Sequence, residues 1–255
     1  MTSSLIIAVD GPAASGKGSI ASRLAAHYGL RHLDTGLLYR ATGLKVLAAG
    51  GDLGDAEAAA RAAESVTPGD LIDETALTSR GAGEAASRVA SHPGVRAALL
   101  KLQQDFARQA GGAVLDGRDI GTVIAPDAPV KLFVTAAPET RARRRWLQLT
   151  GRGEAIAFED MLADIIRRDE RDAGRGAAPM VMADDAAMDD LAFAEITAGK
   201  LFVQKGGEIV AGGGEGVGHE VDVVSEKGFG ARTESTRRLN GDVRQWRCGR
   251  HVKPA

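Results

Sequence analysis

The fold of this chain is decided by nine residues, Gly11-Pro12-Ala13-Ala14-Ser15-Gly16-Lys17-Gly18-Ser19, which contain the pattern G-x-x-x-x-G-K. The apolar run at residues 5–9 comes directly before them and predicts a short strand that is buried on both faces of a sheet. A helical pattern follows, in which Ile20, Leu24 and Tyr28 recur at every fourth residue. A strand, a glycine-rich loop and a helix in this order predict a phosphate-binding loop rather than an ordinary turn.

The residue types of this loop suit a bound phosphate group. Gly11 and Gly16 permit backbone angles that a side chain would forbid, so several N–H groups can point toward one anion. The N-terminus of the following helix adds a partial positive charge, and Lys17 adds a full one. The residue after the lysine, often a hydroxyl residue that ligates magnesium, is Gly18, and the hydroxyl arrives one position later on Ser19.

The composition narrows the class of protein. With 255 residues and 44% hydrophobic residues, the chain can form one large α/β domain or one domain with insertions. A net charge of −2 gives no global reason to expect nucleic-acid or membrane binding, and no apolar run is long enough to span a bilayer. The first apolar run ends at Asp10, unlike a signal peptide, and the single Cys248 excludes an internal disulfide. We therefore expect a cytoplasmic protein.

Strand-like and helix-like segments alternate along the chain. Residues 31–33, 113–115 and 130–134 predict further short strands, and each is followed by a helical pattern or a loop that leads to one. This alternation predicts a parallel sheet with helices on both faces. Residues 52–86 begin alanine-rich and then lose any clear period, so we expect an insertion outside the sheet.

An arginine-rich helix is predicted after Pro138. Arg141, Arg143, Arg144 and Arg145 lie in its first half, where the helix dipole disfavours cations. We interpret these guanidinium groups as reaching toward an anion, with a solvated basic face as the alternative.

The next helix has the clearest amphipathic pattern in the sequence. Arg168, Asp172 and Arg175 are spaced i, i+4 and i+7 and therefore share one face. An isolated surface ion pair at this spacing is worth only a few tenths of a kcal/mol. Two arginines around one carboxylate, shortly after the break at residues 151–153, instead predict a lid over bound phosphates that covers residues 146–175.

Five segments resemble the bacterial cytidylate kinases, a family of nucleoside monophosphate kinases with a phosphate-binding P-loop. They are VDGPAASGKGS, LDTGLLYR, AASRVASHPGVRAALL, VLDGRDIGTVIAPDAPVKLFV and RRDERDAGRGAAP, in this order between residues 5 and 179. The resemblance implies a five-stranded parallel sheet with a nucleotide-binding insertion and a lid. It also implies transfer of the γ-phosphoryl group of ATP to CMP or dCMP, which needs no general base because the attacking monophosphate oxygen is already ionised.

The resemblance further implies the roles of particular residues. Residues 11–19 are expected to bind ATP, with Mg²⁺ as the cofactor and Ser19 as its candidate ligand. The implied catalytic residues are Lys17, Arg118, Arg168 and Arg175. The implied CMP-binding residues are Thr35, Tyr39, Arg40, Ser87, Arg96, Arg118, Asp119, Arg168 and Asp172. ATP and CMP or dCMP are then the partners, nucleic acid and membrane are not expected, and we expect a monomer.

The chemistry of cytosine is consistent with two of these roles. Cytosine presents an amino donor beside two acceptors, so the carboxylate of Asp119 can accept from the amino group and Arg96 can donate to the acceptors. Uracil reverses the donor and acceptor order, which would leave two buried groups mispaired at a cost of about a few kcal/mol.

After Pro179 the resemblance fades. We expect a kinase domain over residues 1–190 and a glycine-rich, basic and poorly ordered tail over residues 191–255. Residues 182–190 are acidic and short of β-branched residues, so the family's next strand is not predicted there. A candidate hairpin at residues 201–210 is expected to persist only if it docks on the open edge of the strand at residues 130–134.

Three alternative functions stay open from the sequence. The chain could be a kinase for another nucleoside monophosphate, which would show in the acceptor that consumes ATP. It could bind ATP with little turnover because its C-terminal element is aberrant. Its basic tail could bind RNA, although arginines without interleaved aromatic residues are weak evidence for this.

Overall fold

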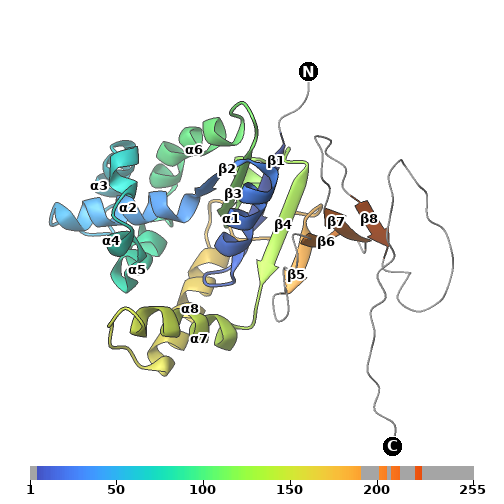
Figure 1. Cartoon of the computed structure of the whole chain (residues 1–255). Coiled ribbons are helices and arrows are strands. Elements are labelled where there is room, and N and C mark those ends of the chain that lie inside the picture. The colour runs from blue at the N-terminus through green and yellow to red at the C-terminus, as the bar shows by residue number, and fades with distance from the viewer. Residues whose placement is uncertain (1–4, 191–200, 206–207, 213–221, 226–255) are drawn as a thin grey trace, which may run out of the picture.

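The computed structural model describes residues 5–190, 201–205, 208–212 and 222–225. A five-stranded sheet with the strand order β2-β3-β1-β4-β5 lies at the centre, with helices on both faces (Figure 1). All neighbouring strands of this sheet are parallel, which confirms the α/β fold with the parallel sheet. Its strands are β1 (Ile6–Asp10), β2 (Arg31–Asp34), β3 (Ala113–Gly117), β4 (Val130–Thr135) and β5 (Ala187–Asp190).

The helices fall into a group beside the sheet and a group that packs on it (Figure 1). The elements that begin between residues 52 and 86 belong to the first group, and none of them adds a strand to the sheet. In the described ranges no helix is long and apolar enough to cross a membrane. The helices are α1 (Lys17–Tyr28), α2 (Thr35–Ala48), α3 (Ala56–Glu64), η1 (Pro68–Leu71), α4 (Glu74–Thr78), α5 (Arg80–Val89), α6 (Pro93–Ala107), η2 (Ile120–Ile124), α7 (Pro138–Thr150) and α8 (Phe158–Ala173).

The central strand β1 is buried on both faces, as its apolar run predicts. Ile7 and Val9 pack against α1 on one face of the sheet. Ile6 and Ala8 point to the other face and pack against α6 and η2. Because successive side chains of a strand alternate between faces, a strand covered on both sides needs an unbroken apolar run. The phosphate loop, residues 11–19, therefore starts from a fixed position at the carboxyl end of β1.

The edge of the sheet differs from the sequence prediction. β5 pairs with β4 in parallel, with Leu132 opposite Ala187, although no strand was predicted at residues 182–190. Lys131 of β4 also contacts the segment just before β5. Its Nζ atom donates to both carboxylate oxygens of Asp185 at 2.9 Å. This long-range contact and the backbone pairing form the strand without help from β-branched side chains.

The hairpin prediction is half right. β6 (Leu201–Lys205) and β7 (Glu208–Gly212) form an antiparallel hairpin, and β8 (Asp222–Ser225) extends it to a separate three-stranded sheet. The edge of β4 is taken by β5 and not by the hairpin, so the predicted docking place was wrong. Apart from these three strands, the predicted tail at residues 191–255 lies outside the described residues.

A matched pair of glycine substitutions tests the position of the phosphate loop. A Cβ atom on Gly11 (φ 144°) would lie 2.0 Å from the Val134 carbonyl oxygen of β4. Gly29 (φ 64°) has no heavy atom within 4 Å of such a Cβ. Urea unfolding should show that Gly11→Ala costs about 3 kcal/mol or more and Gly29→Ala about 1–2 kcal/mol. Equal losses of unfolding free energy in the two variants would contradict the close packing of the loop on β4.

Candidate active site

The phosphate loop joins β1 to α1 in a strained backbone path. Gly11, Ala14 and Gly16 all have positive φ angles, of 144°, 58° and 101°. Ser15 is fully buried in the loop, and its hydroxyl oxygen has no hydrogen-bond partner in the described part of the chain. A buried hydroxyl without a partner is uncommon in proteins and indicates that a ligand completes its hydrogen bonds. Ser19 is exposed in the first turn of α1.

Lys17, the first residue of α1, lies among charged groups of both signs. Burial lowers its pKa to about 8, and the cation of Arg118 acts in the same direction. The carboxylates of Asp116 and Asp34 oppose this shift. An anion beside Lys17 would stabilise its charged form, so the phosphate loop and Lys17 together make a site for a polyanion.

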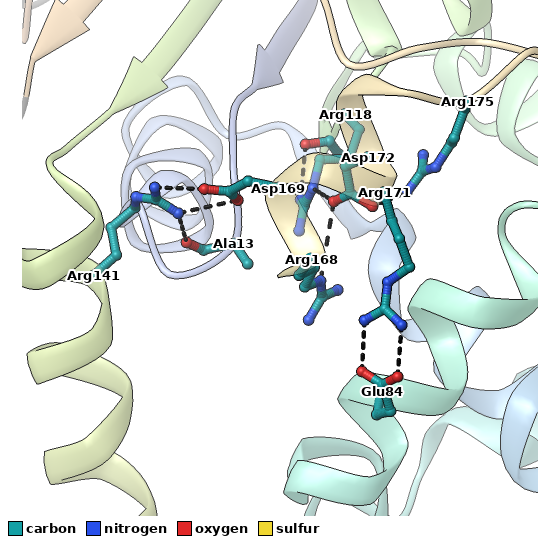
Figure 2. A network of polar contacts seen from close by, with 10 residues as sticks. Ala13, Glu84, Arg118, Arg141, Arg168, Asp169, Arg171, Asp172 and Arg175 are labelled. Carbon is teal, nitrogen blue, oxygen red and sulfur yellow. Dashed lines mark hydrogen bonds and ion pairs between the residues drawn. The ribbon is translucent and has the colours of Figure 1, made fainter. Parts of the chain in front are cut away.

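Three arginines surround one buried carboxylate at the carboxyl end of the sheet (Figure 2). Asp172 of α8 is 1% exposed and accepts hydrogen bonds from Nε of Arg118, at 2.8 Å, and from Arg175. Nε of Arg168 lies 4.0 Å from the same carboxylate. Burial opposes the ionisation of Asp172, but the three cations outweigh it and hold its pKa below the usual value. We call these four residues the arginine cluster.

The arginine cluster has spare charge and spare hydrogen-bond donors. Three guanidinium groups face one carboxylate, which leaves two positive charges without a counter-charge inside the cluster. The Nε atoms of Arg168 and Arg175 are buried and make no hydrogen bond to any described residue. Burial and the neighbouring cation of Arg118 lower the pKa of Arg168. A multiply charged anion with several acceptor oxygens matches all of these features.

A second set of polar side chains lies beside the arginine cluster and suits a planar ligand with both donors and acceptors. Arg96 of α6 forms a buried ion pair with Asp119, just before η2. The Tyr39 ring of α2 lies 5.6 Å from the Arg96 guanidinium carbon. Arg175 interacts electrostatically with both Arg96 and Asp119, which connects this pair to the arginine cluster. Ser87 is buried on α5, and its hydroxyl has no partner in the described ranges.

The other predicted site residues lie around the same edge of the sheet. Thr35 donates from Oγ1 to the Asp116 backbone oxygen at 2.8 Å. Arg40 donates to the Leu77 carbonyl at 2.8 Å and interacts electrostatically with Arg118. Lys17 interacts electrostatically with Arg118 and Arg168, so the phosphate loop and the arginine cluster belong to one site.

Two aspartates of the site were missed by the sequence analysis. Asp10 accepts from the backbone N–H groups of Ile120 and Gly121 at 2.8 and 2.7 Å, which fixes the turn that holds Asp119. Burial raises the pKa of Asp10 to about 6. The other is Asp116. Asp10 is the last residue of β1 and Asp116 the second-last residue of β3. Because ligands bind at this end of the strands in parallel sheets, the two positions were an available signal.

Asp116 lies between β2 and the phosphate loop. Its Oδ1 atom is 2.8 Å from Nε2 of His32, and its Oδ2 atom would lie 3.7 Å from a Cβ added at Gly18. Hydroxyl and carboxylate oxygens are the ligands that Mg²⁺ prefers, usually one or two of them together with substrate phosphates. The carboxylate of Asp116, beside Gly18 of the loop, is a ligand type that suits such a shared site, and the exposed hydroxyl of Ser19 follows one residue after Gly18. No group of three or more His, Cys, Asp or Glu side chains in the described ranges could hold a metal by itself.

The arginines of α7 do not reach outward as a group. Arg141 forms an ion pair with Asp169 of α8, and Arg144 donates to the Ser15 carbonyl at 3.0 Å. Arg145 donates to the Thr78 carbonyl, whereas Arg143 is exposed. Three of the four arginines thus have partners in α8, the phosphate loop or α4. The anion inferred for the group from its position stays a prediction.

Comparison with known proteins gives consistent results. The family model described as cytidylate kinase matches residues 7–198. A cytidylate kinase of Caulobacter vibrioides is 62% identical over 188 residues, which cover 72% of this chain and 86% of the relative. That of Methylobacterium sp. is 63% identical over 182 residues, with 71% and 86% covered. That of Xanthobacter autotrophicus is 61% identical over 192 residues, with 75% and 91% covered.

Asp172→Asn tests the arginine cluster in the absence of ligand. Because three largely buried cations would lose their carboxylate, we expect the free energy of unfolding at neutral pH to fall by about 3 kcal/mol. The lowered pKa of Asp172 means that its stabilisation is present above the unfolded value of 3.8 and is lost as the pH falls through the folded value. The difference in free energy of unfolding between variant and parent should therefore disappear only below pH 3.8.

Glu170→Gln is the matched control for this substitution, because Glu170 is exposed on the same helix. It should leave the free energy of unfolding unchanged within about 0.5 kcal/mol. Urea unfolding of both variants across this pH range provides the measurement. An Asp172→Asn protein as stable as the parent at neutral pH would contradict the role of the carboxylate.

Proposed function

The chain belongs to the cytidylate kinase family, and we propose that it transfers the γ-phosphoryl group of ATP to CMP or dCMP, giving ADP and CDP or dCDP. The observation that supports this most strongly is the Arg96–Asp119 pair beside the arginine cluster, because it offers the donor and the acceptor that the edge of cytosine requires next to the proposed phosphate site. The expectations of a monomeric, cytoplasmic enzyme stay predictions from the sequence.

The phosphate loop is proposed to bind the triphosphate of ATP. Its backbone N–H groups, the α1 N-terminus and Lys17 would face the β- and γ-phosphates, and the unpartnered hydroxyl of Ser15 is an additional donor there. Ser19 and Asp116 would hold Mg²⁺ together with the phosphates. When bound, this ion supplies neutralisation of the phosphate charge.

The arginine cluster is proposed to hold the acceptor phosphate. Arg118, Arg168 and Arg175 would donate to its oxygens and to the γ-phosphoryl group during transfer, and Arg40 adds a cation at the same edge. The attacking oxygen is already ionised at neutral pH, so these residues position the reactants and stabilise charge, and none has to remove a proton. Asp172 keeps the guanidinium groups in place and, with Tyr39, is proposed to lie beside the ribose.

The cytosine ring is proposed to lie at the Arg96–Asp119 pair. Asp119 would accept from the amino group of cytosine, and Arg96 would donate to its ring nitrogen and carbonyl oxygen. Ser87, whose buried hydroxyl has no partner in the described residues, and Thr35 are proposed to lie near the base and sugar. Uracil would place its own N–H and carbonyl groups against the wrong partners.

The structure weakens one reason for the alternative of an ATP-binding protein with little turnover. It depended on an aberrant C-terminal element, but β5 completes the edge of the sheet next to β4. A coupled assay that measures ADP release from ATP, with CMP, dCMP, UMP, AMP and GMP offered in turn as acceptors, tests the proposal. CMP and dCMP should give the fastest release. Another preferred acceptor, or ATP binding with no release, would contradict it.

Asp119→Asn tests cytosine recognition. An amide can rotate to donate to the uracil oxygen, whereas a carboxylate can only accept, so the substitution should reduce the preference for CMP over UMP about tenfold or more. The ratio of kcat/KM for the two acceptors is the measurement. Asp105→Asn, which changes an exposed carboxylate of α6, is the matched control and should keep the ratio. An unchanged ratio in Asp119→Asn would contradict this role.

The titration of Lys17 predicts how ATP binding depends on pH. The free protein has a Lys17 pKa of about 8, and only the charged form attracts the triphosphate. ATP affinity should therefore fall by up to about tenfold per pH unit above pH 8. Calorimetric titration with a non-hydrolysable ATP analogue measures this. Lys17→Met should bind more weakly at all pH values and lose the decline, and a decline that persists would contradict the assignment.

A further inference from the structure

One turn of α8 contacts three separate parts of the molecule (Figure 2). Arg171 donates to both oxygens of Glu84 in α5, at 2.6 Å each. Asp172 accepts from Arg118 at the end of β3. Asp169 points the other way, toward α7 and the phosphate loop (Figure 2). The third of these contacts has no part in the phosphoryl-transfer roles given above.

The residue that Asp169 meets is Arg141 of α7, which is 3% exposed. Its NH1 and NH2 atoms donate to the two carboxylate oxygens of Asp169 at 3.1 and 2.6 Å. NH1 also donates to the Ala13 carbonyl of the phosphate loop at 3.2 Å, and Nε to the Ala136 carbonyl at 2.7 Å. A two-pronged guanidinium–carboxylate contact fixes direction as well as distance, so Asp169 aims Arg141 at the loop.

The contact with Ala13 determines which way the next N–H group points. A trans peptide unit is planar, and its C=O and N–H bonds point in opposite directions. A donor on the Ala13 oxygen therefore turns the Ala14 N–H away from Arg141. Ala14 has a φ of 58°, an unfavourable angle for alanine that needs such an external contact to persist. Arg144 holds the Ser15 carbonyl in the same manner at 3.0 Å.

We propose that Arg141 and Asp169 are positioning residues for ATP: Asp169 aims Arg141 at the Ala13 carbonyl, and this contact keeps the Ala14 N–H directed at the phosphates. The inference rests on the proposed function. Asp169 is adjacent in sequence to Arg168 of the arginine cluster and three residues from Asp172. The pair therefore joins the donor-phosphate loop to the helix that holds the acceptor phosphate, and CMP bound at α8 strengthens ATP binding through it.

A purely structural brace between α7 and α8 would act differently. It would change stability, and any loss of binding would affect ATP and CMP alike. A positioning pair changes ATP binding selectively, and the coupling between the two nucleotides disappears with it. These two measurements separate the two roles.

The experiment uses the full chain, three single variants and the double variant with both Asp169→Asn and Arg141→Lys. Asp169→Asn removes the charge and one of the two acceptors, Arg141→Lys keeps the charge but loses the two-pronged contact, and Glu170→Gln is the exposed control on the same helix. Calorimetry measures the Kd of a non-hydrolysable ATP analogue with and without CMP, and the Kd of CMP alone. Thermal unfolding monitors the fold of each variant.

In Asp169→Asn the Kd of the analogue should rise about tenfold, which is about 1.4 kcal/mol, while the Kd of CMP alone changes less than about twofold. CMP should no longer strengthen analogue binding. Arg141→Lys should act likewise, and the double variant should be no worse than the more affected single variant. Glu170→Gln should match the parent.

Unchanged analogue binding in Asp169→Asn, or equal weakening of analogue and CMP binding, would overturn the inference. If Arg141→Lys does not fold, Asp169→Asn decides alone by the same criteria. Failure of the proposed function shows separately, because the parent protein would then bind no CMP and release no ADP with it.

Discussion

The carboxylate of Asp172, buried among three guanidinium groups, is the contact on which the site depends. Burying three arginines side by side without it would leave like charges facing each other in a region of low dielectric constant. One carboxylate is enough to hold Arg118, Arg168 and Arg175 together, but too little to neutralise them. The remaining positive charge is the basis of the proposed phosphate binding, so the same contact would account for the stability of the cluster and for its chemistry.

Two side-chain pairs join α8, which carries Arg168 and Asp172 of the arginine cluster, to α5 beside the sheet. Arg80 of α5 pairs with Asp164 of α8, and Glu84 of α5 with Arg171. These partly exposed pairs each contribute little to stability. Their effect is orientation, because they hold α5 and α8 together at the edge of the sheet.

Local patterns allowed much of the fold to be predicted. The phosphate loop follows from its glycines and Lys17, and the shared face of Arg168, Asp172 and Arg175 follows from helical spacing. Partners distant in sequence were not predictable from local patterns. Asp169 is 28 residues from Arg141, and Asp185 is 54 residues from Lys131. The internal partner of Arg141 and the edge strand β5 were missed for this reason, since residue spacing does not indicate such tertiary contacts.

A crystal structure of the protein with CMP and a non-hydrolysable ATP analogue tests the central claim most directly. The account predicts the acceptor phosphate within hydrogen-bond distance of Arg118, Arg168 and Arg175, with the analogue's phosphates in the loop at residues 11–19. The cytosine ring should contact Arg96 and Asp119. Density for the CMP phosphate outside the arginine cluster, with the three arginines still held only by Asp172, would contradict it.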